Sequence, residues 1–386
     1  MTQSIKDIAG GKYVLWGASW SLYTAKVRPY LIKKGIDYVE VCPSHPEYND
    51  RIIPTVGYFT VPVLETPDGE IIADSTKIME YLEPKFSDPP MLPEDKSLAA
   101  IAHLIHSFGS EGLTKSAMYL RWNTTFEHRV WIREDFGRTL ATPEQTDEFA
   151  VAMRGFLPIL GITLDHDTDV AVERSIDELY EVLNAHFLKY PYILGGVPSL
   201  ADYGLMGSLY GHHCRDLFAG QRFKKEAPAV HRWTETMLRP PIVDPEVWNV
   251  PQEFFSIDDL PDTLTAFLKL VCENFVPEIR ATIDLYHEWL DAQDRPSGAV
   301  IDMEGVKRCH QVLGQIEHDQ MGVPIKRIAL LDDVSHHMDF QSHVEGMSAA
   351  EKQKLSGVMQ KLGAPDLVDI RLKRGVERRD YTWVLI

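Results

Sequence analysis

The chain has 386 residues and a formal net charge of −18 at pH 7, and its length predicts two or three domains. The negative charge disfavours nonspecific binding to nucleic acid or to an anionic membrane surface. No apolar run approaches the roughly 20 residues of a membrane-spanning helix. Because the first residues also lack the apolar core of a signal peptide, we expect a cytoplasmic protein with no nucleic-acid or membrane partner.

The four cysteines, Cys42, Cys214, Cys272 and Cys309, are widely scattered. They form no C-x-x-C pair and no plausible set of metal ligands. Free thiols in a reducing compartment fit this pattern best, and we expect no bound metal.

The first elements alternate between strand and helix. Lys12–Gly17 reads as a buried strand, Ser19–Tyr23 as a turn, and Thr24–Lys34 as a helix that ends at Gly35. Ile36–Val41 reads as a second strand. The pattern therefore predicts a β-α-β unit at the start of the chain.

A hairpin and a helix follow. Val63–Thr66 and Glu70–Ala73 flank the turn residues Pro67-Asp68-Gly69. Asp74 and Ser75 then open a predicted helix, Thr76–Glu83. The exposed N–H groups of a helix start can bind an anion.

Pro62 lies at the mouth of the hairpin's first strand, where proline is tolerated because it needs no ladder hydrogen bond. We predict a cis Val61–Pro62 bond that leaves the backbone N–H and C=O of Val61 unpaired. Such groups can hold an extended peptide as an added strand. Together with an anion site at Ser75, they suit a small acidic peptide.

A proline-rich linker, Ser87–Pro93, precedes a helical region. Ser199 and Asp202 have the S-x-x-D spacing of a capping box. The predicted helices follow the 3–4 spacing of apolar residues and cover Glu94–Trp122, Asp169–Tyr190, Leu200–Arg215 and Pro228–Leu238.

These segments resemble the glutathione S-transferase family. The resemblance is carried by Val61-Pro62, by Asp74-Ser75 and by Leu194-Gly195-Gly196-Val197-Pro198-Ser199 ahead of Asp202. It implies a thioredoxin-like, glutathione-binding domain over residues 1–88 and an all-helical domain over 93–240. Residues 241–386 form an α+β extension that ordinary members do not need.

The resemblance also implies site residues. Val61, with Pro62 beside it, would hold the cysteinyl backbone of glutathione, and Asp74 and Ser75 its γ-glutamyl end. Ser21 lies five residues after Trp16, as in Ser-type members, and would stabilise the thiolate. The alternatives are that Ser21 only caps the helix, or that Ser19 or Tyr23 contacts the thiol. The loop residues His45, Arg51 and Thr55 are weaker candidates for the glycine end.

The second substrate, a small electrophile, would lie against the helical domain. Candidate residues are Met118, Tyr119, Trp122 and Tyr210–Cys214, although core positions explain each of them more simply. His336, His337, Asp339 and His343 can be read as a metal site, but we expect a solvated polar segment.

The extension contains a strongly apolar helix, predicted over Thr263–Gln293, and a shorter one over Ala349–Leu362. Its end reads as a hairpin of strands Leu367–Leu372 and Tyr381–Ile386. The basic residues of Arg371–Arg379 would form a solvated turn, or else contact an acidic surface of the same chain or of a second subunit. We expect the extension to pack on the first two domains.

Two functions fit this sequence. The first is a cytoplasmic, homodimeric enzyme that adds glutathione to a small electrophile or removes it, with glutathione as the co-substrate. The second is a binding or scaffolding protein that keeps the fold without transferase activity. The two differ in whether Ser21 acts on the thiol.

Overall fold

The computed structural model describes residues 4–123, 126–137, 143–163, 165–240, 247, 249–301 and 310–386. The predicted boundary at 240/241 adjoins residues 241–246, which lie outside this set, as does Cys309.

A four-stranded sheet with the order β2-β1-β3-β4 organises the first domain. β1 (Tyr13–Trp16) pairs in parallel with β2 (Tyr38–Val41), whereas β3 (Val63–Glu65) is antiparallel to both β1 and β4 (Ile71–Ala73). The β-α-β unit and the hairpin that the sequence predicts are therefore confirmed.

Alternation along the strands builds a core on each face of this sheet. Leu15 and Leu64 pack into the main core with the inner faces of α2 (Thr24–Lys33) and α4 (Ser75–Leu82). Val14, Trp16 and Val63 belong to a second cluster, which includes residues of α1 (Ile5–Ala9), the π-helical turn Tyr48–Ile52 and α3 (Ile53–Val56).

The second domain is helical, and the long helix predicted over Glu94–Trp122 is divided by a π-helical turn at Phe108–Gly112. Its helices are α5 (Lys96–Ser107), α6 (Thr114–Trp122), α7 (Phe126–Phe136), α8 (Pro143–Gly155), α9 (His166–Phe187), α10 (Leu200–Ser208), α11 (Leu217–Glu226) and α12 (Pro228–Met237), with a 3-10 turn at Leu157–Leu160 and a π-helical turn at Leu209–Cys214.

The capping box at the start of α10 is present. The carboxylate of Asp202 accepts hydrogen bonds from the backbone N–H groups of Ser199 (2.9 Å) and Ile193 (3.0 Å) and from the indole of Trp233 (3.1 Å). Ser199 and Asp202 therefore form the predicted capping box at the start of α10 and connect this helix to Ile193 and Trp233.

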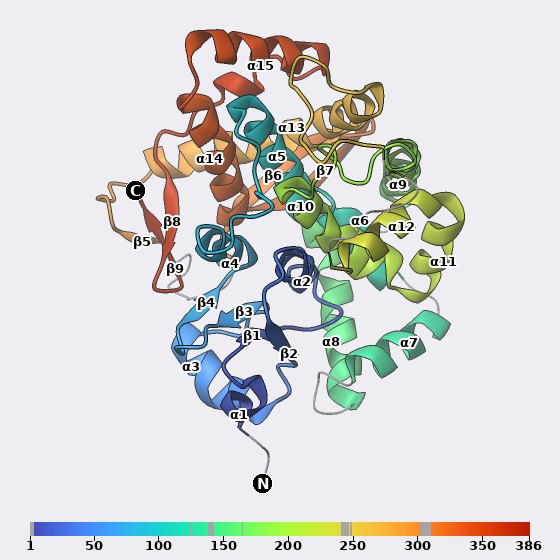
Figure 1. The fold of residues 1–386 in the computed structure, drawn as a ribbon, viewed down its shortest axis with the longest axis vertical. Coiled ribbons are helices and arrows are strands. Elements are labelled where there is room, and N and C mark those ends of the chain that lie inside the picture. The colour runs from blue at the N-terminus through green and yellow to red at the C-terminus, as the bar shows by residue number, and fades with distance from the viewer. Residues whose placement is uncertain are drawn as a thin grey trace.

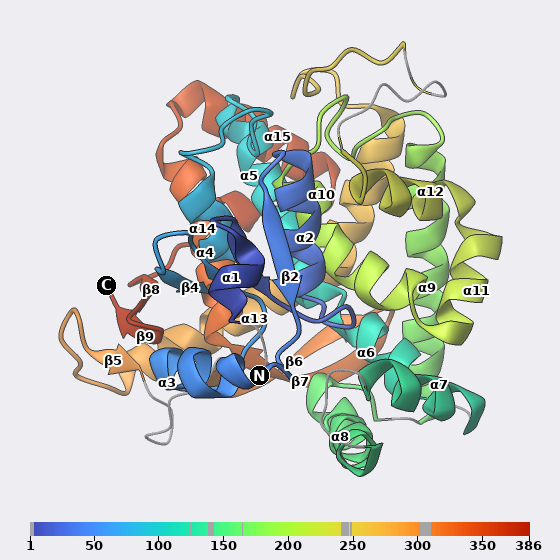
Figure 2. The ribbon, with the colours of Figure 1, turned by 60° about the horizontal axis from the view of Figure 1, so that its bottom comes forward.

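The extension packs against the helical domain and forms hydrogen bonds with the first domain through Tyr381, as expected (Figures 1 and 2). α13 contacts α9, and α14 lies along α5. Its elements are α13 (Asp262–Asp291), β5 (Val300–Ile301), β6 (Val312–Gln320), β7 (Val323–Leu330), α14 (Leu331–Glu345), α15 (Ala349–Lys361), a 3-10 turn at Leu367–Asp369, β8 (Val376–Arg379) and β9 (Thr382–Leu385).

Two expectations for the extension are wrong, and of the alternatives for the basic residues the structure shows a contact with acidic residues of the same chain. Leu367–Leu372 is no strand; it begins with a 3-10 turn, and the first strand of the terminal hairpin is β8. The basic turn is not simply solvated, because the Arg378 side chain is only 6% exposed. His336–His343 is not a solvated segment, because it belongs to α14, which packs on α5.

A buried carboxylate joins α13 to the helical domain. Glu278 forms ion pairs with Lys115 of α6 and Arg327 of β7, and its side chain is 2% exposed. Burial acts to raise the pKa of Glu278, but Arg327 and Lys115 outweigh this effect and lower it to about 2. Glu278 is therefore ionised, and its charge depends on both cations staying in place.

We predict that Glu278→Gln lowers the free energy of unfolding by about 3–5 kcal/mol, because it leaves the buried Lys115 without a carboxylate and Arg327 with Asp333 alone. Glu273→Gln is the matched control on the same helix, since Glu273 is exposed and lies 3.7 Å from Lys269. Urea unfolding of both variants measures the difference. Equal stability of the two would contradict a structural role for the Glu278 pair.

Four histidines meet where α14 packs on α5. The ring centroids of His103 and His343 lie 4.9 Å apart, and those of His106 and His336 lie 5.0 Å apart. Burial lowers the pKa of His103 to about 3 and that of His336 to about 4. Both rings are therefore neutral at pH 7 in the folded protein.

The pKa values of both rings in the folded protein lie below that of an unfolded histidine. Their contribution to the free energy of unfolding is therefore fully present above about pH 6.5 and is lost as the pH falls towards 4. When the pH is lowered from 7 to 5, we predict that the free energy of unfolding falls by about 2 kcal/mol less in His103→Gln than in the unaltered protein. His166→Gln, at an exposed histidine, should leave that loss unchanged. Denaturant unfolding at the two pH values tests this, and an identical pH dependence in both variants would refute it.

Candidate functional site

The three segments that carry Ser21, Val61 and Asp74 adjoin the first sheet at the same end of its strands. Strand register places Trp16 beside Val63, and Val63 beside Ala73. The turn with Ser21 follows the first of these residues, Val61 precedes the second, and Asp74 follows the third. The fold therefore gathers segments that are distant in the sequence at the same end of the sheet.

The Val61–Pro62 bond is cis, as the sequence predicts. The N–H and C=O of Val61 make no hydrogen bond to any residue in the described part of the chain. Val61 is half-buried and Pro62 is buried. The backbone of Val61 therefore offers one donor and one acceptor to an extended ligand.

Asp74 stands at the start of α4 with a φ of 84°, a backbone conformation that is costly for a residue other than glycine. Its Oδ1 accepts hydrogen bonds from the N–H groups of Thr76 (2.8 Å) and Lys77 (3.2 Å). Asp74 is thus a helix cap, and its second oxygen remains available to a cation. The Ser75 side chain that follows is buried.

The hydroxyl of Ser21 is buried in the turn before α2. It accepts a hydrogen bond from the N–H of Thr24 at 3.2 Å, so the capping interpretation fits. A hydroxyl that accepts one hydrogen bond can still donate another, which leaves its proton for a thiolate. Ser19 is exposed, and the hydroxyl of Tyr23 donates to Glu111 at 3.2 Å.

Three of the weaker candidates, Arg51, Thr55 and His213, are engaged in the fold. Arg51 donates to both carboxylate oxygens of Glu65 at 3.0 Å, and the hydroxyl of Thr55 donates to the carbonyl of Arg51. His213 is buried, with Nε2 3.1 Å from the hydroxyl of Ser116 and Nδ1 3.0 Å from that of Tyr180. These contacts favour structural roles.

The terminal hairpin contributes a residue that sequence reasoning did not place here. Nε of Arg378 lies 3.3 Å from Oδ2 of Asp74, and its NH2 nitrogen donates to Asp332 at 2.8 Å. Burial acts to raise the pKa of Asp332, but His310 and Arg378 outweigh it and lower that pKa. The basic run around Arg378, in so acidic a chain, was the available signal.

Beside Arg378, a buried polar cluster fills the space between the two domains and the extension. Nζ of Lys26 donates to the hydroxyl of Ser110 at 2.8 Å. Burial lowers the pKa of Lys26 to about 8 and raises that of Glu111 to about 8. The cavity between Asp74, Asp332 and Arg378 has a volume of only about 20 Å³, which is room for about one water molecule.

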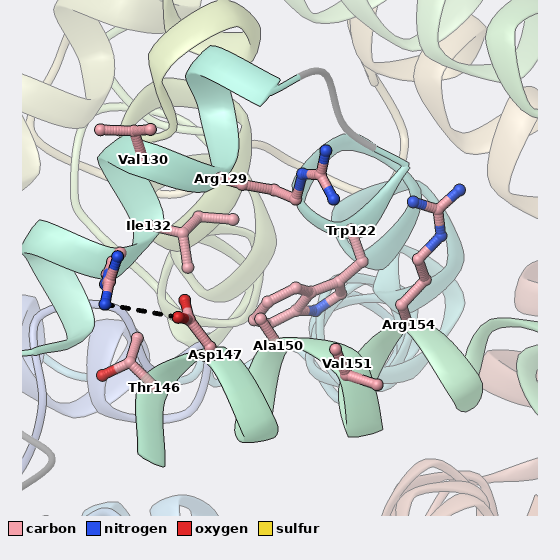
Figure 3. Close-up of a pocket in the computed structure, with 10 residues that line it drawn as sticks. Trp122, Arg129, Val130, Ile132, Thr146, Asp147, Ala150, Val151 and Arg154 are labelled. Carbon is pink, nitrogen blue, oxygen red and sulfur yellow. Dashed lines mark ion pairs between the residues drawn. The ribbon is translucent and has the colours of Figure 1, made fainter. Parts of the chain in front are cut away.

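A larger cavity, of about 380 Å³, lies between α6, α7 and α8 (Figure 3). Trp122 forms part of its wall, and Arg129, Arg133 and Arg154 line it. Arg133 is 3.5 Å from Asp147, whereas Arg129 and Arg154 have no ion pair with any described residue. The lining therefore carries an excess of positive charge.

Aromatic side chains connect this cavity to the turn that holds Ser21. Trp20 stacks on Phe136 with ring centroids 4.5 Å apart, and Trp122 lies 5.8 Å from Phe136. Trp122, which the sequence suggested as a border of the second-substrate site, therefore lies beside a cavity.

Within the described ranges, no group of three or more His, Cys, Asp or Glu residues is arranged to hold a metal ion. None of the helices in the same ranges is long and apolar enough to cross a membrane.

Comparison with solved structures gave distant likenesses. Glutathione transferase GSTFuA3 from Phanerochaete chrysosporium is 18% identical, with 58% of this chain and 96% of that chain covered and a TM-score of 0.43. β-Etherase LigF from Sphingobium sp. strain SYK-6 is 19% identical, with 62% and 98% covered and a TM-score of 0.40. The comparison with curated proteins gave no match.

Two family descriptions match the chain itself. Residues 15–90 match the glutathione S-transferase N-terminal domain, and residues 150–241 match the glutathione S-transferase C-terminal domain. The described elements that follow residue 241 are those of the extension. The chain therefore carries the N-terminal and C-terminal domains of glutathione S-transferases, followed by an extension of helices and strands.

Proposed function

We propose that the protein binds glutathione and transfers it to a small electrophile, or removes it from one. The observation that carries this proposal is the strand register that brings the segments of Ser21, Val61 and Asp74 to one edge of the sheet. Val61 would pair with the cysteinyl backbone, and Asp74 and Ser75 would hold the γ-glutamyl end. A cytoplasmic homodimer is part of the same proposal.

The chemistry requires a thiolate at neutral pH. A hydroxyl that donates to the sulfur stabilises the anion and lowers the pKa of the thiol. Ser21 suits this role because Thr24 fixes its oxygen while its proton stays free to donate. The thiolate then forms a C–S bond with the electrophilic carbon, and the displaced group leaves with the electron pair of its bond.

The cavity beside Trp122 is the proposed place for the electrophile. Its apolar wall includes Ile132 and Ala150, which suits an aromatic or aliphatic body. Because Arg129 and Arg154 line the cavity without ion-pair partners in the described part of the chain, we infer an electrophile that carries a negatively charged group.

A specific observation favours the second function, a glutathione-transferase fold without transferase activity. Arg378 contacts Asp74, and little space remains beside them. If the hairpin never leaves, the protein has no glutathione site. Retention of the full-length protein on glutathione resin, followed by turnover of a generic aromatic electrophile, separates the two functions.

We predict that Ser21→Ala folds normally but raises the pKa of bound glutathione's thiol by about 1–2 units, since a hydrogen bond to a charged group contributes roughly 1.5–3 kcal/mol. The ultraviolet absorbance of the thiolate, titrated against pH, measures this shift. Ser19→Ala is the control, because Ser19 is exposed in the same turn. An unchanged midpoint for Ser21→Ala would exclude Ser21 from contact with the sulfur.

We predict that the double variant Arg129→Gln, Arg154→Gln raises KM for a carboxylated aromatic electrophile roughly 3- to 10-fold, because each exposed ion pair contributes up to about 1 kcal/mol. KM for an uncharged analogue should not change. Arg174→Gln is the control, at an exposed arginine paired with Glu178 at 3.0 Å. Equal effects on both electrophiles would rule out charge recognition in this cavity.

A further inference from the structure

We propose that the terminal hairpin, β8–β9, is a gate over the glutathione site, with Arg378 as an internal competitor of the ligand. In the closed state Arg378 occupies the place at Asp74 that the ammonium group of the γ-glutamyl end would take. Glutathione then binds only when the hairpin moves away. This inference rests on the proposed function, because it assumes that Asp74 and Ser75 form the ligand's site.

The two cations compete for one carboxylate oxygen. Oδ1 of Asp74 is used by the backbone N–H groups at the start of α4, so Oδ2 is the oxygen that faces a cation. Nε of Arg378 lies 3.3 Å from it. The cavity of about 20 Å³ beside them has room for about one water molecule, so the γ-glutamyl end of the tripeptide cannot enter it while Arg378 is in place.

The extension holds Arg378 in position for this role. Its guanidinium donates to Asp332 at 2.8 Å and to the hydroxyl of Tyr58 at 3.2 Å, and it lies 4.3 Å from the ring centroid of Trp383. A group that is tethered in this way acts at a high effective concentration. It therefore competes well against a free ligand.

The contact between the hairpin and the first domain includes an ion pair and hydrogen bonds, whose groups can pair with water or a ligand when the hairpin opens, and the Tyr381 ring also packs on the apolar cluster of Val14, Trp16 and Val63. β8 and β9 pair with β5 in a sheet of their own and do not join the sheet of β4. Apart from Arg378, the contact includes the hydroxyl of Tyr381, which donates to the carbonyl of Ile71 at 2.8 Å, and that of Tyr58, which donates to the carbonyl of Tyr381 at 3.1 Å. Figures 1 and 2 both show β8 and β9 beside β4.

The turn of the hairpin is built for this contact. Asp380 and Tyr381 have φ values of 46° and 60°; in a two-residue hairpin turn aspartate is usual at the first position, whereas glycine is usual at the second, where Tyr381 stands. Such conformations persist when the surroundings enforce them, and they cluster at clamps and switches. Here the strained Tyr381 is the residue that contacts Ile71.

The test compares glutathione binding by the full-length protein, Arg378→Gln and Arg379→Gln in isothermal titration calorimetry. Arg379 is the matched control, because it neighbours Arg378, is 55% exposed and pairs with Glu377. We expect Arg378→Gln to bind glutathione at least about tenfold more tightly than the other two proteins. Thermal unfolding confirms that each variant is folded.

A second measurement uses the unaltered protein and does not depend on the folding of a variant. Amide hydrogen exchange of residues 376–385 should become faster when glutathione is added at saturation. Unchanged or slower exchange, or equal affinities of Arg378→Gln and the unaltered protein, overturns the gate and leaves the proposed function standing. If none of the three proteins binds glutathione, both the gate and the proposed function are wrong.

Discussion

A series of ion pairs, mostly buried, runs from the helical domain through the extension to the first domain, and opposite charges alternate along it except at the neighbouring Asp333 and Asp332. Lys115 pairs with Glu278, Glu278 with Arg327, and Arg327 with Asp333 at 3.2 Å. Asp332, which precedes Asp333 in the sequence, pairs with Arg378. Arg378 in turn pairs with Asp74. A buried charge is tolerated only beside an opposite one, so each member fixes the position of the next.

This alternation explains how one extension both stabilises the fold and covers the site. Glu278 places α13 and β7 against the helical domain, and α14 follows β7 directly. Asp332 at the start of α14 is then close enough to hold Arg378 above α4. A chain without the extension would leave Asp74 open to a ligand, whereas here its free oxygen faces a cation of the same polypeptide.

The sequence predicts what local patterns determine. The first strands and helices, the Val61–Pro62 bond and the capping box at Ser199 depend on neighbours within a few residues, and these predictions are confirmed. Arg378 was placed in a turn because its partner Asp74 lies 304 residues away, beyond any local pattern. The strand expected at Leu367–Leu372 failed for a similar reason, since its apolar residues pack in the extension's core from a 3-10 turn.

The same charges make the exchange between hairpin and ligand energetically balanced. When an ammonium group replaces Arg378 at Asp74, one ion pair is lost and another is formed at the same carboxylate. When the hairpin leaves, Asp332 keeps its hydrogen bond with His310, whose Nδ1 lies 3.2 Å from Oδ2 of Asp332, so this carboxylate is not left without a partner. In the proposed site, the net affinity for glutathione would then depend on the contacts that have no counterpart in the hairpin, namely the backbone of Val61 and the hydroxyl of Ser21. A site of this kind selects a ligand that carries both an ammonium group and a peptide backbone, because an ammonium group alone only replaces what Arg378 already supplies.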